Sequence, residues 1–147
     1  MIELLIPNKL RSSLNKQLLE KRAQRCFSLA GLKQQHVTLK FCDDIEMRRL
    51  NKNYRGIDET TDVLSFNLNF DDPQAQETYL GDIIISIPRA ALQAIDHDQS
   101  LEDEIALLLI HGLLHLQGYD HVEEKQKNEM FALQENIFTK LMNTENE

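Results

Sequence analysis

Residues 100–121 constrain the fold of this 147-residue chain more than any other segment. Ser100 begins a capping box for a helix predicted over Leu101–Gln117. The run Ile105–Ile110 is apolar on every side of that helix, so we expect the helix to be buried in the middle of the molecule. Gly118 is predicted to end the helix, because glycine readily takes the left-handed conformation that turns the chain back.

Three histidines lie along the same segment. His111 and His115 are four residues apart, which places them on one face of a helix, about 40° apart around its axis. His121 follows the predicted helix end at Gly118 and is placed to reach an ion bound by the first two. Three imidazoles suit Zn²⁺, or another transition metal such as nickel, with the fourth position left for water. We therefore predict one zinc ion per chain, in a catalytic rather than a structural site.

The spacing of these histidines matches the metzincin protease motif His-Glu-x-x-His-x-x-Gly-x-x-His except at one position. The protease glutamate that takes a proton from water is replaced here by Gly112, so peptide hydrolysis is the weaker hypothesis. Either another group accepts the proton or the hydroxide on the ion acts largely alone. Asp120, beside His121, is one candidate to accept this proton or to orient a ligand imidazole, and a cap for the following helix is an equal alternative.

Composition indicates an ordinary soluble globular chain, with 41% hydrophobic and 27% charged residues. A length of 147 residues favours one domain over 1–147. No apolar run approaches the ~20 residues of a membrane span, and the first residues do not resemble a secretory signal. Cys26 and Cys42 form no CxxC pair, so we expect reduced core cysteines and a cytoplasmic location.

The net charge of −8 is unevenly distributed. Residues 1–56 hold twelve Lys and Arg against five Asp and Glu, whereas residues 57–147 hold four against nineteen. This asymmetry predicts a cationic face that binds a polyanion, with a simply solvated face as the alternative. The basic residues crowd two predicted helices, as Lys9, Arg11, Lys16, Lys21, Arg22 and Arg25 on the first and Arg48, Arg49, Lys52 and Arg55 on the second.

The hydrophobic periodicity predicts strands and helices that are interspersed along the chain. The predicted strands cover residues 2–6, 37–41, 61–68 and 79–87. The predicted helices cover residues 9–30, 44–54, 88–96, 101–117 and 122–142, followed by a frayed tail over 143–147. We expect an α+β domain in which helices pack on one mixed sheet of about four strands and the metal-bearing helix is central and buried.

Arg55 leaves the end of the second basic helix and opens the loop into the strand at residue 61. An arginine there can direct two donors at one phosphate, which a lysine does less well. The alternative is a surface arginine paired with Asp58 or Glu59.

Three segments together resemble the YbeY family of bacterial rRNA maturation factors. They are Asn53-Tyr54-Arg55 followed by Thr61-Asp62-Val63-Leu64-Ser65-Phe66, then Leu80-Gly81-Asp82-Ile83, and finally His111-Gly112-x-Leu114-His115-Leu116-x-Gly118-Tyr119-Asp120-His121. The resemblance covers roughly residues 45–125, and Gly112 separates the third segment from the proteases. The family commonly has a proline directly before and directly after the stretch Thr61–Phe66. This chain has Thr60 and Asn67 at those positions.

The resemblance implies a zincin-like fold and a metal-dependent endoribonuclease specific for single-stranded RNA. It implies His111, His115 and His121 as zinc ligands and Arg55 as the functionally important arginine. It further implies a role in maturation of small-subunit (16S) rRNA and in ribosome quality control. Expected partners are the small ribosomal subunit and a GTPase that assists its assembly.

Given this resemblance, we expect hydrolysis of an RNA phosphodiester at the three-histidine site, with Arg55 stabilising the negative charge that develops on the phosphoryl oxygens. Two alternatives stay open. One is a different metal-dependent hydrolase, acting on a peptide or small ester. The other is a non-enzymatic ribosome assembly factor in which the metal only holds the fold.

Overall fold

The computed structural model describes residues 1–70, 78–120 and 122–145, apart from the side chains of residues 69 and 70. A four-stranded sheet, ordered β1-β2-β4-β3, forms its centre. Strands β1, β2 and β4 run parallel, and β3 pairs antiparallel with β4 at the edge. The strands are β1 (Ile2–Leu5), β2 (His36–Cys42), β3 (Val63–Phe70) and β4 (Tyr79–Ser86). The predicted mixed sheet and α+β class are confirmed.

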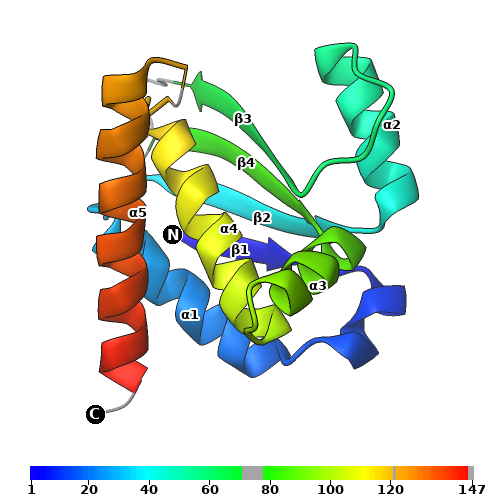
Figure 1. The fold of residues 1–147 in the computed structure, drawn as a ribbon, viewed down its shortest axis with the longest axis horizontal. Coiled ribbons are helices and arrows are strands. Elements are labelled where there is room, and N and C mark those ends of the chain that lie inside the picture. Colours follow the sequence, from blue (N-terminus) through cyan, green and yellow to red (C-terminus); the bar gives the residue numbers. More distant parts are fainter. Residues whose placement is uncertain (71–77, 121, 146–147) are drawn as a thin grey trace.

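The helices divide between the two faces of this sheet (Figure 1). They are the 3-10 helix η1 (Asn8–Ser13), α1 (Lys16–Leu29), α2 (Asp44–Arg55), α3 (Ile87–Asp96), α4 (Leu101–Leu116) and α5 (Glu124–Glu145). Ile83 and Ile85 of β4 belong to the main core with α1 and α4, whereas Ile84 belongs to a smaller core with Met47 of α2. Because successive strand residues point to opposite faces, α2 covers the face opposite to α4.

Helix α4 lies at the centre, as the apolar run predicts. Ile110 and Leu113 are fully buried, and Leu114 nearly so. The Ser100 hydroxyl accepts a hydrogen bond from the Asp103 amide at 3.1 Å, which caps the helix as expected. Gly118, with φ of +98°, follows the helix end and takes the left-handed conformation.

The helix predicted over residues 9–30 is wrong in its first third. Residues 8–13 form η1, the chain is extended at Leu14, and α1 begins at Lys16 after Asn15, whose side chain accepts from the Leu18 amide. Asn15 caps α1, because its side chain can replace the missing backbone acceptor at a helix start. The basic residues expected on one helix are therefore divided between two elements.

The frayed tail expected from residue 143 is also wrong for residues 143–145, while residues 146 and 147 lie outside the described part. Helix α5 continues to Glu145, whose carboxylate accepts from Arg22 Nε at 2.7 Å and from Arg22 Nη2 at 2.8 Å. Arg22 also pairs with Asp103 at 2.8 Å. This pairing buries Arg22, so it is absent from any cationic face.

Two further features concern the cysteines and the apolar content of the helices. Burial raises the pKa of both Cys26 and Cys42 to about 12, which keeps these thiols protonated and unreactive. No helix in the described part of the chain combines the length and apolar content that a membrane span requires.

Candidate metal centre

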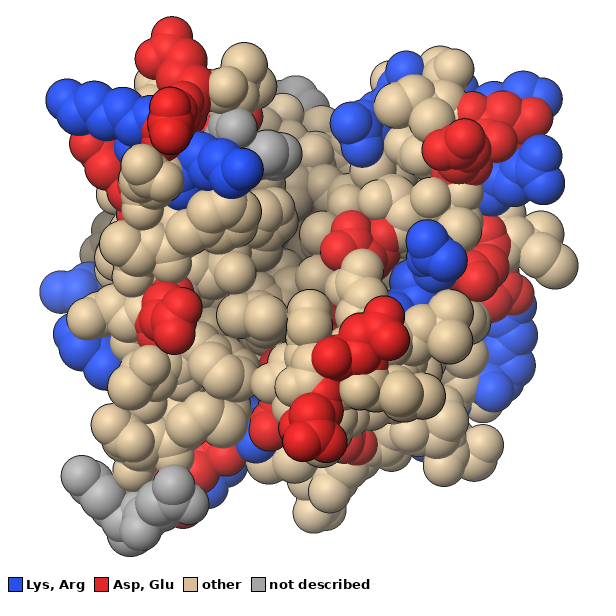
Figure 2. All heavy atoms as spheres, viewed as in Figure 1, with Lys and Arg blue, Asp and Glu red and all other residues tan. Residues whose placement is uncertain are grey.

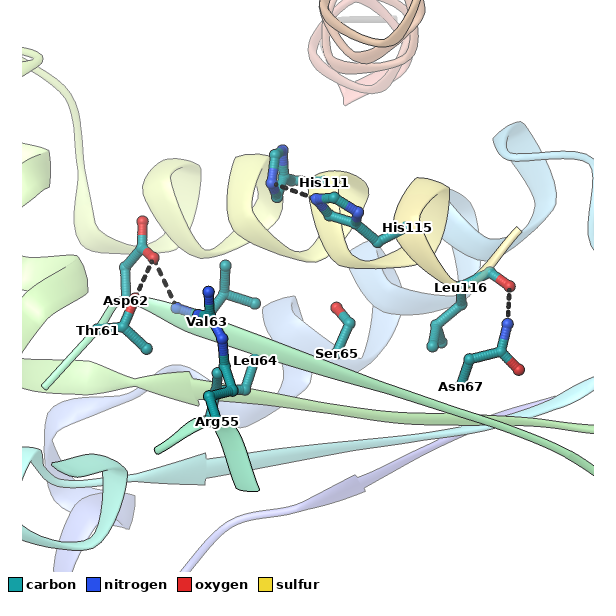
Figure 3. A pocket seen from close by; sticks show the side chains of 10 residues that line it. All are labelled: Arg55, Thr61, Asp62, Val63, Leu64, Ser65, Asn67, His111, His115 and Leu116. Carbon is teal, nitrogen blue, oxygen red and sulfur yellow. Dashed lines mark hydrogen bonds between the residues drawn. The ribbon is translucent and has the colours of Figure 1, made fainter. Parts of the chain in front are cut away.

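His111 and His115 project from the same side of α4, one turn apart (Figure 3). Both side chains are half-buried, and their Nε2 atoms are 3.0 Å apart. Two imidazole nitrogens bound to one tetrahedral zinc ion at about 2.0–2.1 Å lie roughly 3.3 Å from each other. The two rings therefore already converge as a pair of ligands would.

Gln134 of α5 fixes the orientation of the first ring. Its Oε1 lies 2.9 Å from His111 Nδ1, and a carbonyl oxygen can only accept, so Nδ1 carries the proton. The lone pair of His111 is then on Nε2, the atom that faces His115. Metal-bound histidines are commonly held in this way by a second partner on the other nitrogen. No sequence motif indicates Gln134, which lies 23 residues further along the chain on another helix.

His121, the third predicted ligand, lies outside the described residues. Within the described part, no group of three or more His, Cys, Asp or Glu side chains is arranged to hold an ion. The two described histidines nevertheless fit a metal of the zinc class, because their nitrogens converge and Gln134 sets the tautomer. Asp120 is exposed in the turn after α4.

A cleft of about 370 Å³ lies between α4 and β3, and it brings Arg55 together with the two histidines (Figure 3). Arg55 extends from the end of α2 toward Val63 and Leu64 of β3 and lines the cleft with them (Figure 3). Gly56 follows it with φ of +73°, and this left-handed turn ends α2 and directs the chain into the loop before β3. Residues from positions 61–67 form the remaining wall, with Leu116 at one end.

The expected alternative for Arg55, an ion pair with Asp58 or Glu59, is not seen among the described residues. Asp58 instead accepts from Arg48 Nε at 2.9 Å. That interaction lowers the pKa of Asp58 through its hydrogen bond to Arg48. Arg55 is exposed and forms no ion pair within the described chain, so its guanidinium faces the cleft as a cation.

Polar contacts connect β3 to α4. Asn67 Nδ2 donates to the carbonyl oxygen of Leu116 at 3.0 Å, which satisfies one of the acceptors left over at the end of α4. Ser65 Oγ lies 3.5 Å from the carbonyl oxygen of Gly112. Asp62 is held through both oxygens, by the Val63 amide at 2.8 Å and by Gln93 Nε2 at 3.1 Å. The cleft wall is therefore fixed from both ends.

Two glycines allow the close packing behind the cleft. A Cβ at Gly112 would lie 2.9 Å from Ile83 Cγ2, and one at Gly81 would lie 2.1 Å from the carbonyl oxygen of Phe66. The position that bears glutamate in the proteases thus faces the sheet, with no room for a carboxylate. The sequence motif around Gly81 has a steric explanation that periodicity alone does not suggest.

The fold and the cleft together define an α+β protein with a paired histidine donor set opposite an exposed arginine. The family model described as "Endoribonuclease YbeY" matches residues 6–142. Among curated relatives, endoribonuclease YbeY of Heliobacterium modesticaldum is 44% identical over 132 residues, covering 82% of this chain and 79% of that protein. The protein of the same name from Desulfitobacterium hafniense is 41% identical and covers 92% of this chain and 90% of its own length.

The solution structure of TM1509 from Thermotoga maritima is similar over 99% of this chain and 92% of that one, with a TM-score of 0.69 and 28% identity. This chain belongs to the YbeY family of endoribonucleases. The expected family is confirmed, and with it the class of activity: hydrolysis of RNA phosphodiester bonds in rRNA processing.

Proposed function

We propose that this chain cleaves single-stranded RNA at the cleft between α4 and β3, with His111, His115 and His121 holding one transition-metal ion, zinc by preference. The observation that carries the proposal is the convergence of the two described histidines in the same cleft as Arg55. An ion of this class, when bound, lowers the pKa of a coordinated water and withdraws electron density from a phosphoryl oxygen.

The side chains of this protein supply the remaining functions. Arg55 donates to the non-bridging phosphate oxygens and stabilises the charge that grows on them, because a guanidinium presents two parallel N–H groups. Gln134 holds the His111 ring so that Nε2 keeps its lone pair. The contact between Asn67 and Leu116 keeps β3 and α4 at a fixed separation, so that Arg55 and the histidines face one phosphate.

Cationic residues around the cleft support an RNA substrate. Lys and Arg residues gather over α2, on one side of a hollow in the surface (Figure 2). Lys52 of α2 is exposed and forms no ion pair within the described residues. These charges supply affinity through the RNA backbone, which carries no sequence information.

The more specific biological role is a proposal that rests on the family resemblance. It comprises small-subunit rRNA, particularly its 3′ end, as the substrate, a cytoplasmic location, and a GTPase that assists subunit assembly as a partner. We propose these for the chain as well, since relatives that match most of it bear the same enzyme name.

Metal analysis combined with an RNA cleavage assay tests the proposal. The purified protein should carry about one transition-metal ion per chain, and His115→Ala should lose it together with cleavage of an unpaired RNA. A control, Ile95→Ala on the exposed surface of α3, should keep both. Full metal content without any RNA cleavage by the wild-type protein would refute the nuclease and favour a structural metal in an assembly factor.

A further inference from the structure

A second groove, of about 480 Å³, lies on the opposite face of β3 from the metal cleft. It is formed where α2 stops short of covering the sheet. Met47 of α2 is fully buried against the sheet, Leu50 is half-buried, and Tyr54, one turn further, is 68% exposed. Beyond Tyr54 no described helix covers this face. The later part of β3 and the earlier part of β4 are therefore open here.

The walls of this groove are aromatic and apolar. Phe66 of β3 contacts Tyr54 in a T-shaped arrangement, with ring centroids 5.0 Å apart. Leu68 is 39% exposed at the open end, and Ile84 forms part of the floor. An exposed tyrosine packed edge-on against a second ring leaves one ring face open for a planar ligand.

One carboxylate lies within the groove. Asp82 is the cross-strand partner of Phe66, so both side chains are on the same face of the sheet. Asp82 accepts a hydrogen bond from the Tyr79 hydroxyl, and Thr38 Oγ1 lies 2.8 Å from the same hydroxyl oxygen. A carboxylate repels phosphate but accepts hydrogen bonds from the N–H groups of a nucleobase.

The groove is continuous with the metal cleft. Ser65 and Asn67 line both, because β3 is the edge strand and forms the ridge between them. At this ridge the chain places Tyr54 and Arg55 side by side in sequence, with Tyr54 lining the groove and Arg55 lining the cleft. Lys52, three residues before Arg55 on α2, adds an exposed positive charge that forms no ion pair among the described residues.

We infer that this groove binds an unpaired RNA base next to the scissile phosphate, stacked on Tyr54. The inference rests on the proposed function. A strand whose phosphate is held by Arg55 passes over the edge of β3, and its neighbouring base enters the groove. The two sides of the ridge match the two parts of a nucleotide: cations face the phosphate, and aromatic rings face the base.

Fluorescence anisotropy with an unpaired, fluorescein-labelled RNA of twelve nucleotides tests the subsite, with RNA integrity checked on a gel. Tyr54→Ala should weaken binding about tenfold, as expected for the loss of one stacked base. Tyr54→Phe keeps the ring and should bind like the wild type. Ile95→Ala is exposed, lines neither the cleft nor the groove, and should also bind like the wild type.

An abasic scan of the same RNA distinguishes stacking from a general loss of affinity. Removing one particular base should weaken binding to the wild-type protein by about the same factor as Tyr54→Ala, and should have no further effect on that variant. Equal binding by Tyr54→Ala and wild type, or an abasic effect that is undiminished in Tyr54→Ala, overturns the inference.

Cleavage assays on the same preparations separate the two claims. If His115→Ala abolishes cleavage while Tyr54→Ala binds RNA normally, only the base subsite is refuted. If the wild-type protein binds RNA but never cuts it, the proposed function is refuted, and the abasic scan still decides whether Tyr54 holds a base. Thermal unfolding should show that Tyr54→Ala remains folded, because the Tyr54 side chain is largely outside the core.

Discussion

Gly112 separates this chain from the proteases whose histidine spacing it shares, and its reason is steric. The helix approaches β4 so closely that a Cβ would meet three atoms of Ile83 at 2.9, 3.1 and 3.2 Å. A glycine in a helix normally costs about 1 kcal/mol relative to alanine. Here close packing against the sheet offsets that cost.

Gly112→Ala should therefore destabilise the protein by about 1–3 kcal/mol, although the same change stabilises an ordinary helix. Urea unfolding followed by circular dichroism measures this. Combining Gly112→Ala with Ile83→Ala should cost less than the two single changes added together, because the second removes the atoms that the new methyl meets. A stabilised Gly112→Ala variant would contradict the packing described.

Gln134 provides a test of the metal centre at one residue. Gln134→Ala removes the acceptor for His111 Nδ1 and should weaken metal binding by about 10- to 100-fold. Gln134→Glu keeps an acceptor oxygen at the same position and should retain most of the affinity. Competition with a chromophoric chelator measures both variants. Unchanged affinity in Gln134→Ala would mean that this contact does not orient the ligand.

Thr60 and Asn67, which stand where the family commonly has proline, each donate a side-chain hydrogen bond. Thr60 Oγ1 donates to Asp44 Oδ1 at 3.1 Å, and Asn67 Nδ2 donates to the Leu116 carbonyl. Proline has no side-chain donor and makes neither bond. The sequence marks both positions as unusual, but their partners lie 16 and 49 residues away and require the fold to be known.

At the scale of elements, local signals predict most of the helices and strands. The buried α4, its Ser100 cap and its end before Gly118 follow from periodicity and capping chemistry, which act within one or two turns. The break between η1 and α1 is not predicted, because the leucine spacing continues through it. The ordered end of α5 is not predicted either, since it depends on Arg22, 123 residues away.

The pairing of Arg22 with Glu145 predicts a dependence of stability on pH. The hydrogen bonds from Arg22 lower the pKa of Glu145 below its ordinary value of 4.5. The stabilisation is therefore fully present above the unfolded-state pKa and is lost as the pH falls through the folded-state value. Below that value Glu145 is protonated and no longer serves as an anionic partner of Arg22.

Glu145→Gln should destabilise the protein by about 1 kcal/mol at pH 7, because solvent screens the carboxylate of this exposed residue, and by much less below the folded-state pKa. Urea unfolding at a series of pH values measures the difference between the variant and wild type. Glu20→Gln serves as a control, because Glu20 is exposed and its pair with Lys16, at 3.8 Å, is exposed as well. A difference that stays constant with pH would show that the ion pair does not hold α5.

At the scale of the whole molecule, the charge asymmetry of the sequence becomes an uneven surface. The cations expected in the first 56 residues do not form one face, because Arg22 is buried and Lys9 pairs with Asp43. On α2, Arg48 pairs with Asp58 and Arg49 with Glu46, whereas Lys52 and Arg55 form no ion pair among the described residues. Lys and Arg side chains gather over this helix, on one side of a hollow (Figure 2). Charge counts along a sequence predict that a cationic surface exists, but its place depends on which side chains find acidic partners after folding.

RNA affinity should therefore fall as the salt concentration rises. Removing a positive charge from α2 should reduce this salt dependence, whereas removing one from α1 should not. Lys52→Ala should reduce the slope of log affinity against log salt concentration by about 0.7, the value for one contact to single-stranded nucleic acid. Lys16→Ala on α1 should leave the slope unchanged. Anisotropy titrations at several salt concentrations measure both. An equal effect of the two variants would indicate that RNA is attracted by the overall electrostatic field of the protein and not by a binding surface at α2.

The central claim is that one cleft joins the histidine pair to Arg55 for hydrolysis of RNA. Its most direct test is the single-turnover cleavage rate of an unpaired RNA at saturating, metal-loaded protein. Arg55→Ala should cut at least about 100-fold more slowly, since it loses a donor that stabilises the transition state. Arg55→Lys, which keeps the charge but loses the paired donors, should be intermediate. Wild-type rates in Arg55→Ala, with binding and metal content intact, would contradict the account.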